Sequence, residues 1–559
     1  MKLFHPLHFR PAIFFLACWL LPAAICTATN YYADPSPAGS MQNAGTFNAP
    51  WANLSSIFAA NKTFQAGDTI FLRTGNHGYA LIRGMNSGYV VIMPQAGQNP
   101  VIERIRVAAS ATITASYWKL YRLTIQSEST GSTATPAYTL LEVYPQADHI
   151  TISECIVSSN LNTTGWTRDD WRNRCNNGIF LRGRLNAHHL LEKNLILNTA
   201  FPLTVASSNT VVRENTVRYF TNDGSRLLGS YDRFEKNRIM DLIKVMTTAE
   251  NHDDLFQSFV YAPGGTGQDT LKADTIRGNV FINTTDTTRA FRGNTQGIGC
   301  FDGVYLNWII ENNIVMTDHW HGIAMYGAVN CIIVNNTVLD PYPYSPFDSF
   351  DVHATNIGPA WIHIDKKSSG PPSTGNTIKN NLVANVVTLA APSMGLAYNN
   401  ISIGPVANYS TYFVDVSDFA HPDSFDLHLK PGCPAIDAGD PSNAPAFDFD
   451  GVARPQGPAF DLGAYEFVGT SAAETPTPAF RFSLYPNPSD GRLSVDFQGS
   501  KQAYYDLEIF TVLGNRVGKF GNRKMDSAGD LDLSGLEKGV YFIRLSCGGQ
   551  ACCKVFMLE

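Results

Sequence analysis

The chain has 559 residues, of which 16 % are charged, and its formal net charge is −7 at pH 7. No basic stripe runs through the sequence, so nucleic acid is excluded as an expected partner. Asn, Thr, Ser and Gly are plentiful, a composition typical of a long β-structure with many polar turns and not of a helical enzyme.

The amino-terminal segment has the features of an export signal. Lys2 and Arg10 precede an apolar run from Ile13 to Ile25, and Cys26 to Ala28 are small. This pattern predicts a signal peptide over residues 1–28, cleaved after Ala28, and a secreted or cell-surface protein. The run is too short to cross a bilayer and no other stretch is long enough, so we expect no membrane span.

One short pattern repeats through the middle of the chain. Apolar or β-branched residues flank an Asn, and these Asn residues recur at about 22 residues or roughly twice that, apart from one gap of 34 residues that holds a partly inserted coil. The marked positions are Asn194, Asn215, Asn237, Asn279, Asn313, Asn336, Asn381 and Asn400, with Cys155 in the corresponding place upstream. The period predicts a solenoid of β-coils. We expect each Asn to take the left-handed conformation at a sharp bend and the stacked side chains to form a ladder.

These coils resemble the right-handed parallel β-helix of pectate-lyase-like proteins, and the hand is implied by that resemblance. Segments at both ends, from Tyr31 to Leu72 and from Cys433 to Glu466, resemble the opening and closing segments of such helices. We therefore expect an all-β fold with a β-helix domain over residues 30–467. A short helix over residues 53–60 should cover the first coil, since an uncovered coil end is an exposed sheet edge.

The closing segment is rich in carboxylates. Asp448, Asp450, Asp461 and Glu466 could hold Ca²⁺. The alternative is a hydrogen-bonded cap without a metal.

The last eighty or so residues form a separate module after a linker at residues 468–479. Alternating segments such as Tyr505–Phe510 and Val540–Leu545 predict half-buried strands of a small β-sandwich over residues 480–559. Tyr485-Pro-Asn-Pro488 and the L-x-x-G-x-Y-x-x-x-L pattern from Leu536 to Leu545 resemble the type A C-terminal sorting domain of type IX secretion cargo. The resemblance implies type IX secretion machinery as a partner; we expect a monomer.

Polar residues recur in successive coils where a strand begins after a loop. They are Asn177, Asp223, Asp254, Gln296 and His321. Outward neighbours would be Arg182, Arg226, Gln257 and Asp302, with aromatic residues Trp166, Trp171, Tyr305, Trp320 and Tyr326 nearby. Rings, amides, carboxylates and guanidiniums in one column predict a groove for an extended polysaccharide. The alternative is that such residues, above all Asn177 and Gln296, only satisfy turn backbone.

The run His252-Asp253-Asp254 is the strongest candidate for catalysis, because three adjacent titratable groups repel one another and have little structural reason to be there. We expect these three residues to share one open cleft with Arg226 and His321, and Asp254 to be the most important.

Two catalytic schemes fit these residues. In β-elimination of a uronate, a cation (Arg226, Lys244, Arg289 or Arg292) neutralises the carboxylate and His252 or His321 removes the α-proton. In inverting hydrolysis, an acid and a base flank a water. The order Asn222-Asp223-Gly, Asp253-Asp254, His321-Gly is similar to that of the polygalacturonase family, but Asn and Asp are adjacent here, an extra coil precedes His321, and no Arg-x-Lys follows. We therefore favour a polysaccharide lyase, with a hydrolase or a non-catalytic adhesin as alternatives.

Eight cysteines remain after processing, in irregular spacing. An exported chain can oxidise them, and Cys155–Cys175 and Cys300–Cys331 are candidate bridges between neighbouring coils.

Overall fold

The computed structural model describes most of the chain, and its residues fall into two compact units, Met1–Val468 and Gly469–Glu559. The described residues are 28–127, 138–183, 185–245, 253–260, 270–286, 288–339, 359–367, 370–385, 387–404, 414–415, 418–469, 480–487, 489–499, 504–511, 516–524, 529–547 and 550–558. The predicted signal peptide up to residue 27 and most of the predicted linker lie outside them.

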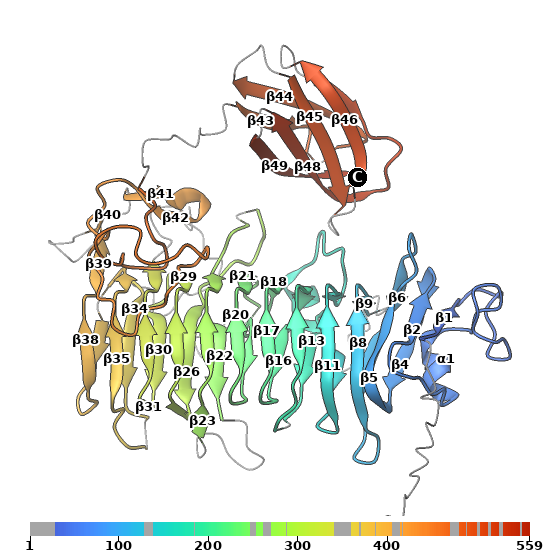
Figure 1. Cartoon of the computed structure of the whole chain (residues 1–559), viewed down its shortest axis with the longest axis horizontal. Helices are drawn as coiled ribbons and strands as arrows, with labels where there is room; N and C mark the ends of the chain where they lie inside the picture. The colour runs from blue at the N-terminus through green and yellow to red at the C-terminus, as the bar shows by residue number, and fades with distance from the viewer. Residues whose placement is uncertain are drawn as a thin grey trace, which may run out of the picture. The chain divides into compact units, whose positions relative to one another are not determined.

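The first unit is built from three long parallel sheets whose coils stack along its axis (Figure 1). Sheet A consists, in spatial order, of β1 (Asn30–Ala33), β2 (Thr69–Leu72), β5 (Gly84–Pro94), β8 (Ala115–Tyr121), β11 (Ala147–Ser153), β14 (Leu190–Glu192), β17 (Val211–Arg213), β20 (Arg233–Glu235), β24 (Thr275–Arg277), β28 (Ile309–Glu311), β32 (Ile332–Val334), β35 (Asn376–Lys379) and β38 (Gly395–Tyr398). Sheet B consists of β3 (Gly75–Asn76), β6 (Pro100–Ile102), β9 (Thr124–Gln126), β12 (Ile156–Ser158), β15 (Leu195–Thr199), β18 (Thr216–Phe220), β21 (Arg238–Leu242), β25 (Val280–Ile282), β29 (Ile314–Met316), β33 (Thr337–Leu339), β36 (Leu382–Val383), β39 (Ile401–Gly404) and β40 (Val414–Asp415).

Sheet C carries the candidate site. It consists of β4 (Tyr79–Ile82), β7 (Arg104–Val107), β10 (Thr139–Val143), β13 (Asn177–Leu181), β16 (Leu203–Val205), β19 (Arg226–Leu227), β22 (Asp254–Phe259), β26 (Gln296–Asp302), β30 (His321–Tyr326), β34 (Trp361–Asp365) and β37 (Val387–Leu389). A short sheet of β23 (Thr270–Lys272), β27 (Val304–Leu306) and β31 (Ala328–Val329) lies between sheets C and A in the chain.

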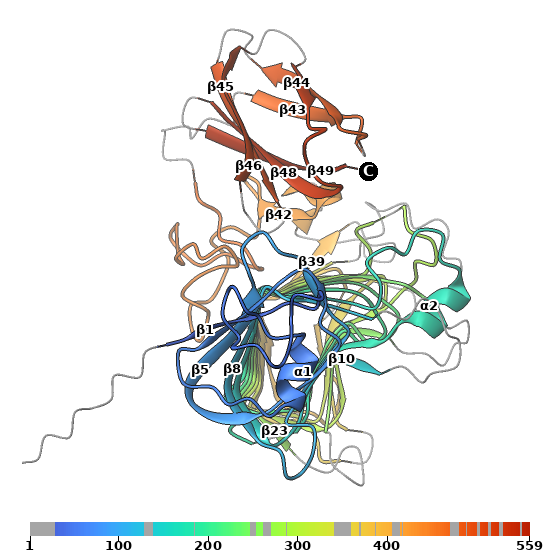
Figure 2. The same ribbon diagram turned by 90° about the vertical axis from the view of Figure 1, so that its right-hand side faces the viewer.

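The solenoid is right-handed. Seen from its amino-terminal end in Figure 2, the chain runs from sheet A (β1, β5, β8) through sheet B (β39) to sheet C (β10), clockwise as it recedes from the viewer. The chain is therefore a right-handed parallel β-helix, as predicted.

In-register apolar side chains fill the interior of the coils. In sheet A, Leu191 pairs with Val212, Val212 with Phe234, and Phe234 with Ile276, and all four are fully buried. Helix α1 (Leu54–Ala59) covers one end of this core, where it buries Leu54, Ile57 and Phe58. The side chain of its N-cap residue Asn53 accepts from the Ser56 N–H. The predicted covering helix is confirmed.

The asparagine ladder is confirmed. Each amide nitrogen donates to the side-chain oxygen of the Asn in the next coil, at 2.8–3.1 Å from Asn194 through to Asn400. The predicted left-handed conformation, however, belongs to the residue before each Asn: Lys193, Glu214 and Lys236 have φ of 55–56°. The preceding residue makes the bend, which leaves the Asn side chain pointing inward to reach its neighbour.

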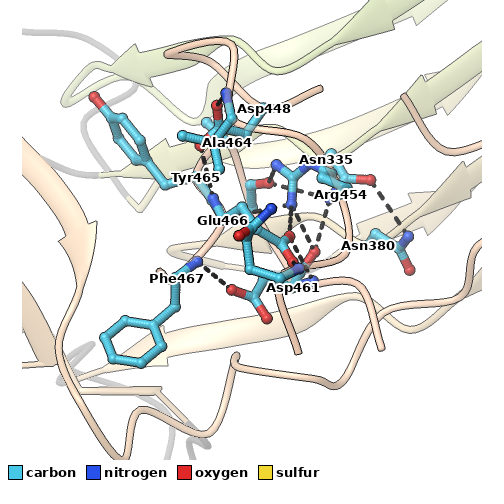
Figure 3. Close-up of polar contacts among 12 residues, drawn as sticks. Asn335, Asn380, Asp448, Arg454, Asp461, Ala464, Tyr465, Glu466 and Phe467 are labelled. Carbon is cyan, nitrogen blue, oxygen red and sulfur yellow. Dashed lines mark hydrogen bonds and ion pairs between the residues drawn. The ribbon is translucent and has the colours of Figure 1, made fainter. Parts of the chain in front are cut away.

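The carboxyl-terminal cap uses its carboxylates internally (Figure 3). The buried Arg454 guanidinium donates to Glu466 at 2.8 Å. Asp461 accepts from the backbone N–H groups of residues 437 and 467, and Asp448 accepts from those of residues 452 and 466. Asp450 pairs with His428 at 2.7 Å. Because these oxygens face N–H donors and a guanidinium, a cation would be repelled by the donors already present, and the residues do not fit a calcium site.

The predicted disulfides are wrong. Cys155, Cys175, Cys300 and Cys331 are free, buried thiols. Burial raises the pKa of Cys155 to about 12 and that of Cys331 to about 11. Cys155 instead occupies a ladder position, where its backbone N–H donates to the Asn194 side chain at 3.0 Å.

The second unit has two antiparallel sheets and a core of its own. One sheet contains β43 (Phe480–Tyr485), β44 (Arg492–Gly499) and β47 (Gly529–Asp532); the other contains β46 (Arg516–Lys524), β45 (Tyr504–Thr511), β48 (Gly539–Cys547) and β49 (Gln550–Leu558). Leu493, Leu507, Ile543 and Phe556 are fully buried between them.

Candidate functional site

The predicted polar column exists at the starting edge of sheet C. Asp254 pairs in register with Gln296, and the backbone N–H of Asp254 donates to Asp223 Oδ1 at 3.0 Å. His321 Nδ1 lies 2.9 Å from Gln296 Oε1. Asp223, Asp254, Gln296 and His321 therefore occupy equivalent places in four successive coils.

Asp254 is the most enclosed member of the column. Gly299, on the neighbouring strand β26, alternates with the core residues Ile298 and Cys300 and so faces outward. A Cβ atom on Gly299 would lie 2.4 Å from Asp254 Oδ1 and 2.6 Å from the Phe301 ring. The Asp254 carboxyl group therefore occupies, on the outer face of sheet C, the space that a side chain at position 299 would need.

This carboxyl group lacks the partners that buried acids usually have. Asp254 is fully buried, and neither of its carboxyl oxygens has a hydrogen-bond partner within 3.5 Å among the residues that the structure describes. Burial raises its pKa well above the ordinary value, and the nearby Asp223 and Asp253 raise it further; Arg226 and the Gln257 amide act in the opposite direction. Asp254 thus holds its proton to a much higher pH than an exposed Asp.

Asp223 and Arg226 form an ion pair one coil away. Asp223 Oδ2 accepts from Arg226 Nε at 2.7 Å and from Nη2 at 2.6 Å. The guanidinium carbon lies 3.9 Å from the centre of the Phe201 ring and 5.6 Å from that of Phe259. Burial raises the pKa of Asp223, with Arg226 opposing the shift. Arg226 is held in place by this bidentate contact and the ring, and it remains half-exposed.

Asp253 points to a different partner. Its carboxylate binds Lys244 Nζ at 2.8 Å, and both side chains are buried. Lys244 belongs to a segment secured by α2 (Arg168–Arg174), whose Arg168 donates to the Lys244 carbonyl at 2.9 Å. Figure 2 shows α2 on the β10 side of the solenoid, so these loops flank sheet C. Asp253 thus has a cationic partner of its own, while its carboxylate still contributes to the raised pKa of Asp254.

Histidine and aromatic rings continue the column past Gln296. The backbone N–H of His321 donates to His319 Nδ1 at 3.0 Å. The Trp320 and Trp361 rings stack with their centroids 5.5 Å apart. The Trp361 and His321 ring centroids are 5.8 Å apart. Because a Gln side-chain oxygen only accepts, the Gln296 contact assigns the His321 proton to Nδ1 and makes Nε2 the basic nitrogen.

Asn177 lies level with Asp223 two coils earlier, with Phe201 in the coil between them, and its side-chain oxygen accepts from the Phe201 N–H at 3.4 Å. Several other predicted residues do not join the column. Asp302 is exposed at the opposite end of β26, about 20 Å from Gln296 at roughly 3.3 Å per residue. Tyr305 and Trp171 are buried and cannot line a groove. His252 lies outside the described residues. The expectation that Asp253 and Asp254 face an open cleft is wrong, because 3 % and 0 % of their surfaces are exposed.

The four candidate cations differ in their partners. Arg226 and Lys244 pair with Asp223 and Asp253, and Arg289 lies 3.4 Å from Asp286. Arg292 Nη1 is buried without a hydrogen-bond partner among the described residues.

Sequence reasoning missed Gly299, Phe301 and Trp361. Gly299 was visible as the second glycine of Gln296-Gly-Ile-Gly, and Trp361 begins β34, the strand of sheet C that follows β30. Nothing in the sequence marked Phe301 as a neighbour of Asp254.

No set of three or more His, Cys, Asp or Glu side chains is arranged to bind a metal ion in the part of the chain that the structure covers. Over the same residues, no helix is long and apolar enough to cross a membrane.

Residues 483–559 match the family described as "Secretion system C-terminal sorting domain". The chain is thus a right-handed parallel β-helix protein with a C-terminal sorting domain, and that domain implies export by secretion machinery to the cell surface or beyond. Comparison with curated protein sequences finds no match.

Solved structures with a similar fold include three proteins of known description. Pectate lyase Pel9A is 15 % identical, with a TM-score of 0.41 over 79 % of this chain and 97 % of that one. The Dettilon tailspike protein is 10 % identical, with a TM-score of 0.38 over 88 % and 76 %. The A-module of the Azotobacter vinelandii mannuronan C-5 epimerase AlgE4 is 12 % identical, with a TM-score of 0.31 over 68 % and 99 %.

Proposed function

We propose that this protein is an exported lyase that cleaves a uronic-acid-containing polysaccharide on the outer face of sheet C. The observation that carries the proposal is the Asp254 carboxyl group, buried, without a hydrogen-bond partner and with a raised pKa. A buried polar group in this state costs stability, so a catalytic role explains its presence where a structural role does not.

In this proposal Asp254 is the general acid and His321 the general base. His321 Nε2 removes the proton from the carbon next to the uronate carboxylate, and that electron pair forms a carbon–carbon double bond. The bond from the adjacent carbon to the glycosidic oxygen breaks, and Asp254 gives its proton to that oxygen. Gln296 lies between the two groups, whose backbones are two coil steps or roughly 10 Å apart, a gap that a sugar ring can occupy.

Arg226 is the residue best placed to bind the uronate carboxylate. Asp223 holds its Nε and Nη2, which leaves Nη1 as the guanidinium nitrogen outside this ion pair. A cation held in this way stabilises the negative charge that builds up on the carboxylate during proton removal.

Access to Asp254 requires side-chain movement. The Gln257 amide and the Phe301 ring lie beside its carboxyl group, and both side chains are half-exposed. The proposal therefore includes rotation of one of them when a glycan binds.

A cationic patch on the same face of sheet C supports an acidic substrate. Arg104, Arg106 and Arg182 surround one carboxylate, Glu142, at 3.7, 3.0 and 2.5 Å. Three guanidiniums and one carboxylate leave a surplus of positive charge. Arg104 and Arg182 also pack on the rings of Tyr138 and Tyr144, and rings beside guanidiniums suit an acidic sugar.

Inverting hydrolysis is the alternative reaction. It needs a carboxylate that activates water and a second carboxyl group that acts as an acid, but the Asp223 carboxylate is bound to Arg226 and to the Asp254 N–H. The lyase proposal needs no second carboxyl group.

The experiment incubates the full chain from Thr29 with polygalacturonate, alginate, a glucuronan and the neutral polymer dextran. Two readouts are taken: ultraviolet absorbance of an unsaturated product, and reducing ends. A lyase gives both signals on an acidic polymer and neither on dextran. Reducing ends alone would replace the lyase with a hydrolase, and neither signal on any acidic polymer would support a binding scaffold.

A further inference from the structure

A cavity lies at the amino-terminal end of the solenoid, far from Asp254. It has a volume of about 370 Å³ and lies between residues 61–64, which follow α1, residues 83–86 at the start of β5, and residues 112–114 before β8. We call it the amino-terminal pocket. Its size falls within the range of ligand pockets, roughly 300–1,000 Å³. Sheet C separates β4 from β22 by six strand steps, about 29 Å, so the pocket is not part of the column.

The charge of this pocket is unbalanced. Lys62 and Arg83 line it, and no Asp or Glu is among its lining residues. Arg83 Nη1 donates to Asn61 Oδ1 at 2.9 Å, but Arg83 Nε is buried without a hydrogen-bond partner in the described structure. The Lys62 ammonium lies 5.2 Å from the Trp51 ring centre. A buried N–H of a guanidinium without an acceptor is costly, and an anionic ligand would supply that acceptor.

The remaining lining residues suit a hydroxylated ligand with an apolar face. Phe64 and the buried Trp118 meet with ring centroids 5.5 Å apart, and Trp118 Nε1 donates to the Gly84 carbonyl at 3.2 Å, which fixes the indole. Thr112 and Thr114 contribute hydroxyl groups, and Asn61 and Asn86 contribute amides. Rings for the face of a sugar, hydroxyls and amides for its hydroxyl groups, and two cations for a carboxylate together describe a carboxylated sugar.

We propose that the amino-terminal pocket binds a uronic-acid residue, either as a free sugar or at the end of an acidic glycan, without cleaving it. The site would hold a polymer to the protein at a distance from the column. It does not require that the protein be a lyase, because recognition rests on the pocket's own cations and rings.

The test measures binding of methyl glucuronide and methyl galacturonide to the full chain by calorimetry, with methyl galactoside as the neutral match and inorganic phosphate as a simple anion. A short oligouronate in a parallel titration separates a chain end from a free sugar. We expect a uronide to bind at least about tenfold more tightly than the neutral glycoside, since one lost charge-assisted contact is worth about that factor. Binding should fall by about tenfold or more in Arg83→Gln with Lys62→Gln.

Matched variants keep the outcome interpretable. Arg233→Gln removes an exposed arginine of sheet A and should leave binding unchanged, and Arg226→Gln reports any binding in the column. If the double variant is unstable, Lys62→Gln alone should still weaken binding, because Lys62 is only half-buried at the rim.

Three outcomes would overturn the inference: unchanged binding in the pocket variants, equal binding of the neutral glycoside, or binding of phosphate but of neither uronide. Uronide binding without any cleavage of polymers would support this inference and reject the lyase. Cleavage of polymers without uronide binding in the pocket would support the lyase and reject this inference.

Discussion

At the scale of single residues, the enclosed Asp254 sets both the chemistry and the stability of the site. Its carboxyl group sits in the space left by Gly299, beside Asp223 and the Gln257 amide. Functional sites often keep groups that weaken the fold because the chemistry needs them. Two variants separate these contributions.

Asp254→Asn keeps the size of the side chain and removes its acidic proton. We expect cleavage of the acidic polymer to fall by about two orders of magnitude or more, because the leaving oxygen loses its proton donor. Initial rates on the best polymer of the panel measure this. Asp302→Asn, at the exposed far end of β26, is the control; full activity in Asp254→Asn would place the site elsewhere.

The same variant should change how stability depends on pH. The pKa of Asp254 is raised in the folded protein, so folding favours the protonated form. The wild type therefore loses stability as pH rises from the carboxyl pKa of the unfolded chain towards the raised pKa of the folded one. Asn cannot ionise, so Asp254→Asn should melt about 1–3 °C higher than the wild type at neutral pH, with little difference near pH 4. Melting curves from pH 4 to 8 test this, and a parallel offset at every pH would contradict it.

Gly299→Ala tests the position of the carboxyl group without touching it. The added methyl would lie 2.4 Å from Asp254 Oδ1, so Asp254 must move, and we expect activity to fall by about tenfold or more since small misplacements of catalytic groups are costly. Gly183→Ala is the control, because a Cβ atom there meets only the Ala206 carbonyl at 3.6 Å. Wild-type rates in Gly299→Ala would argue against Asp254 as the acid.

At the scale of elements, the asparagine ladder joins each coil to the next. Asn237 accepts from the backbone and the amide of Asn215 and donates to the Val212 carbonyl and to Asn279. The turn between sheets A and B thus depends on one side chain per coil.

Asn237→Ala should therefore destabilise the β-helix by about 2–5 kcal/mol, because it leaves several buried groups unpaired at about 1–3 kcal/mol each. Asn400→Ala, at the last rung of the ladder among the described residues, should cost less. Denaturant unfolding of both variants measures the difference. Equal losses would mean that the ladder is not continuous in the way its hydrogen bonds indicate.

At the scale of the whole molecule, the two units have separate cores. The apolar clusters of the β-helix and of residues 480–558 share no residue. A sorting module that is built in this way can be removed without opening the core of its cargo.

A chain that ends at Val468 should fold, melt cooperatively and keep the activity of the full chain on the acidic polymer. The same truncation should abolish export in a cell that secretes the full chain, because the sorting domain is missing. Melting curves, cleavage rates and the amount of protein outside the cell are the three measurements. Loss of cooperative melting would show that the β-helix depends on the removed residues.

The sequence could predict what each coil repeats. The Asn ladder and the column of Asp223, Asp254, Gln296 and His321 each keep a fixed place in successive coils, so aligning the coils also aligned these residues in space. The sorting domain carries its own local motifs. These features depend on the length of the repeat and on contacts between adjacent coils, and both can be read from the sequence.

The tertiary structure decided what surrounds those residues. Whether Asp254 is exposed depends on Gly299 and Phe301, more than forty positions away along the chain. Whether Asp253 has a cationic partner depends on Lys244, which lies in a loop. The cap carboxylates bind Arg454 and backbone N–H groups and do not form a calcium site. The four cysteines of the predicted disulfides are free thiols. Burial, pairing and pKa are set by distances across the fold, and residues that do not repeat give no periodic signal from which to predict those distances.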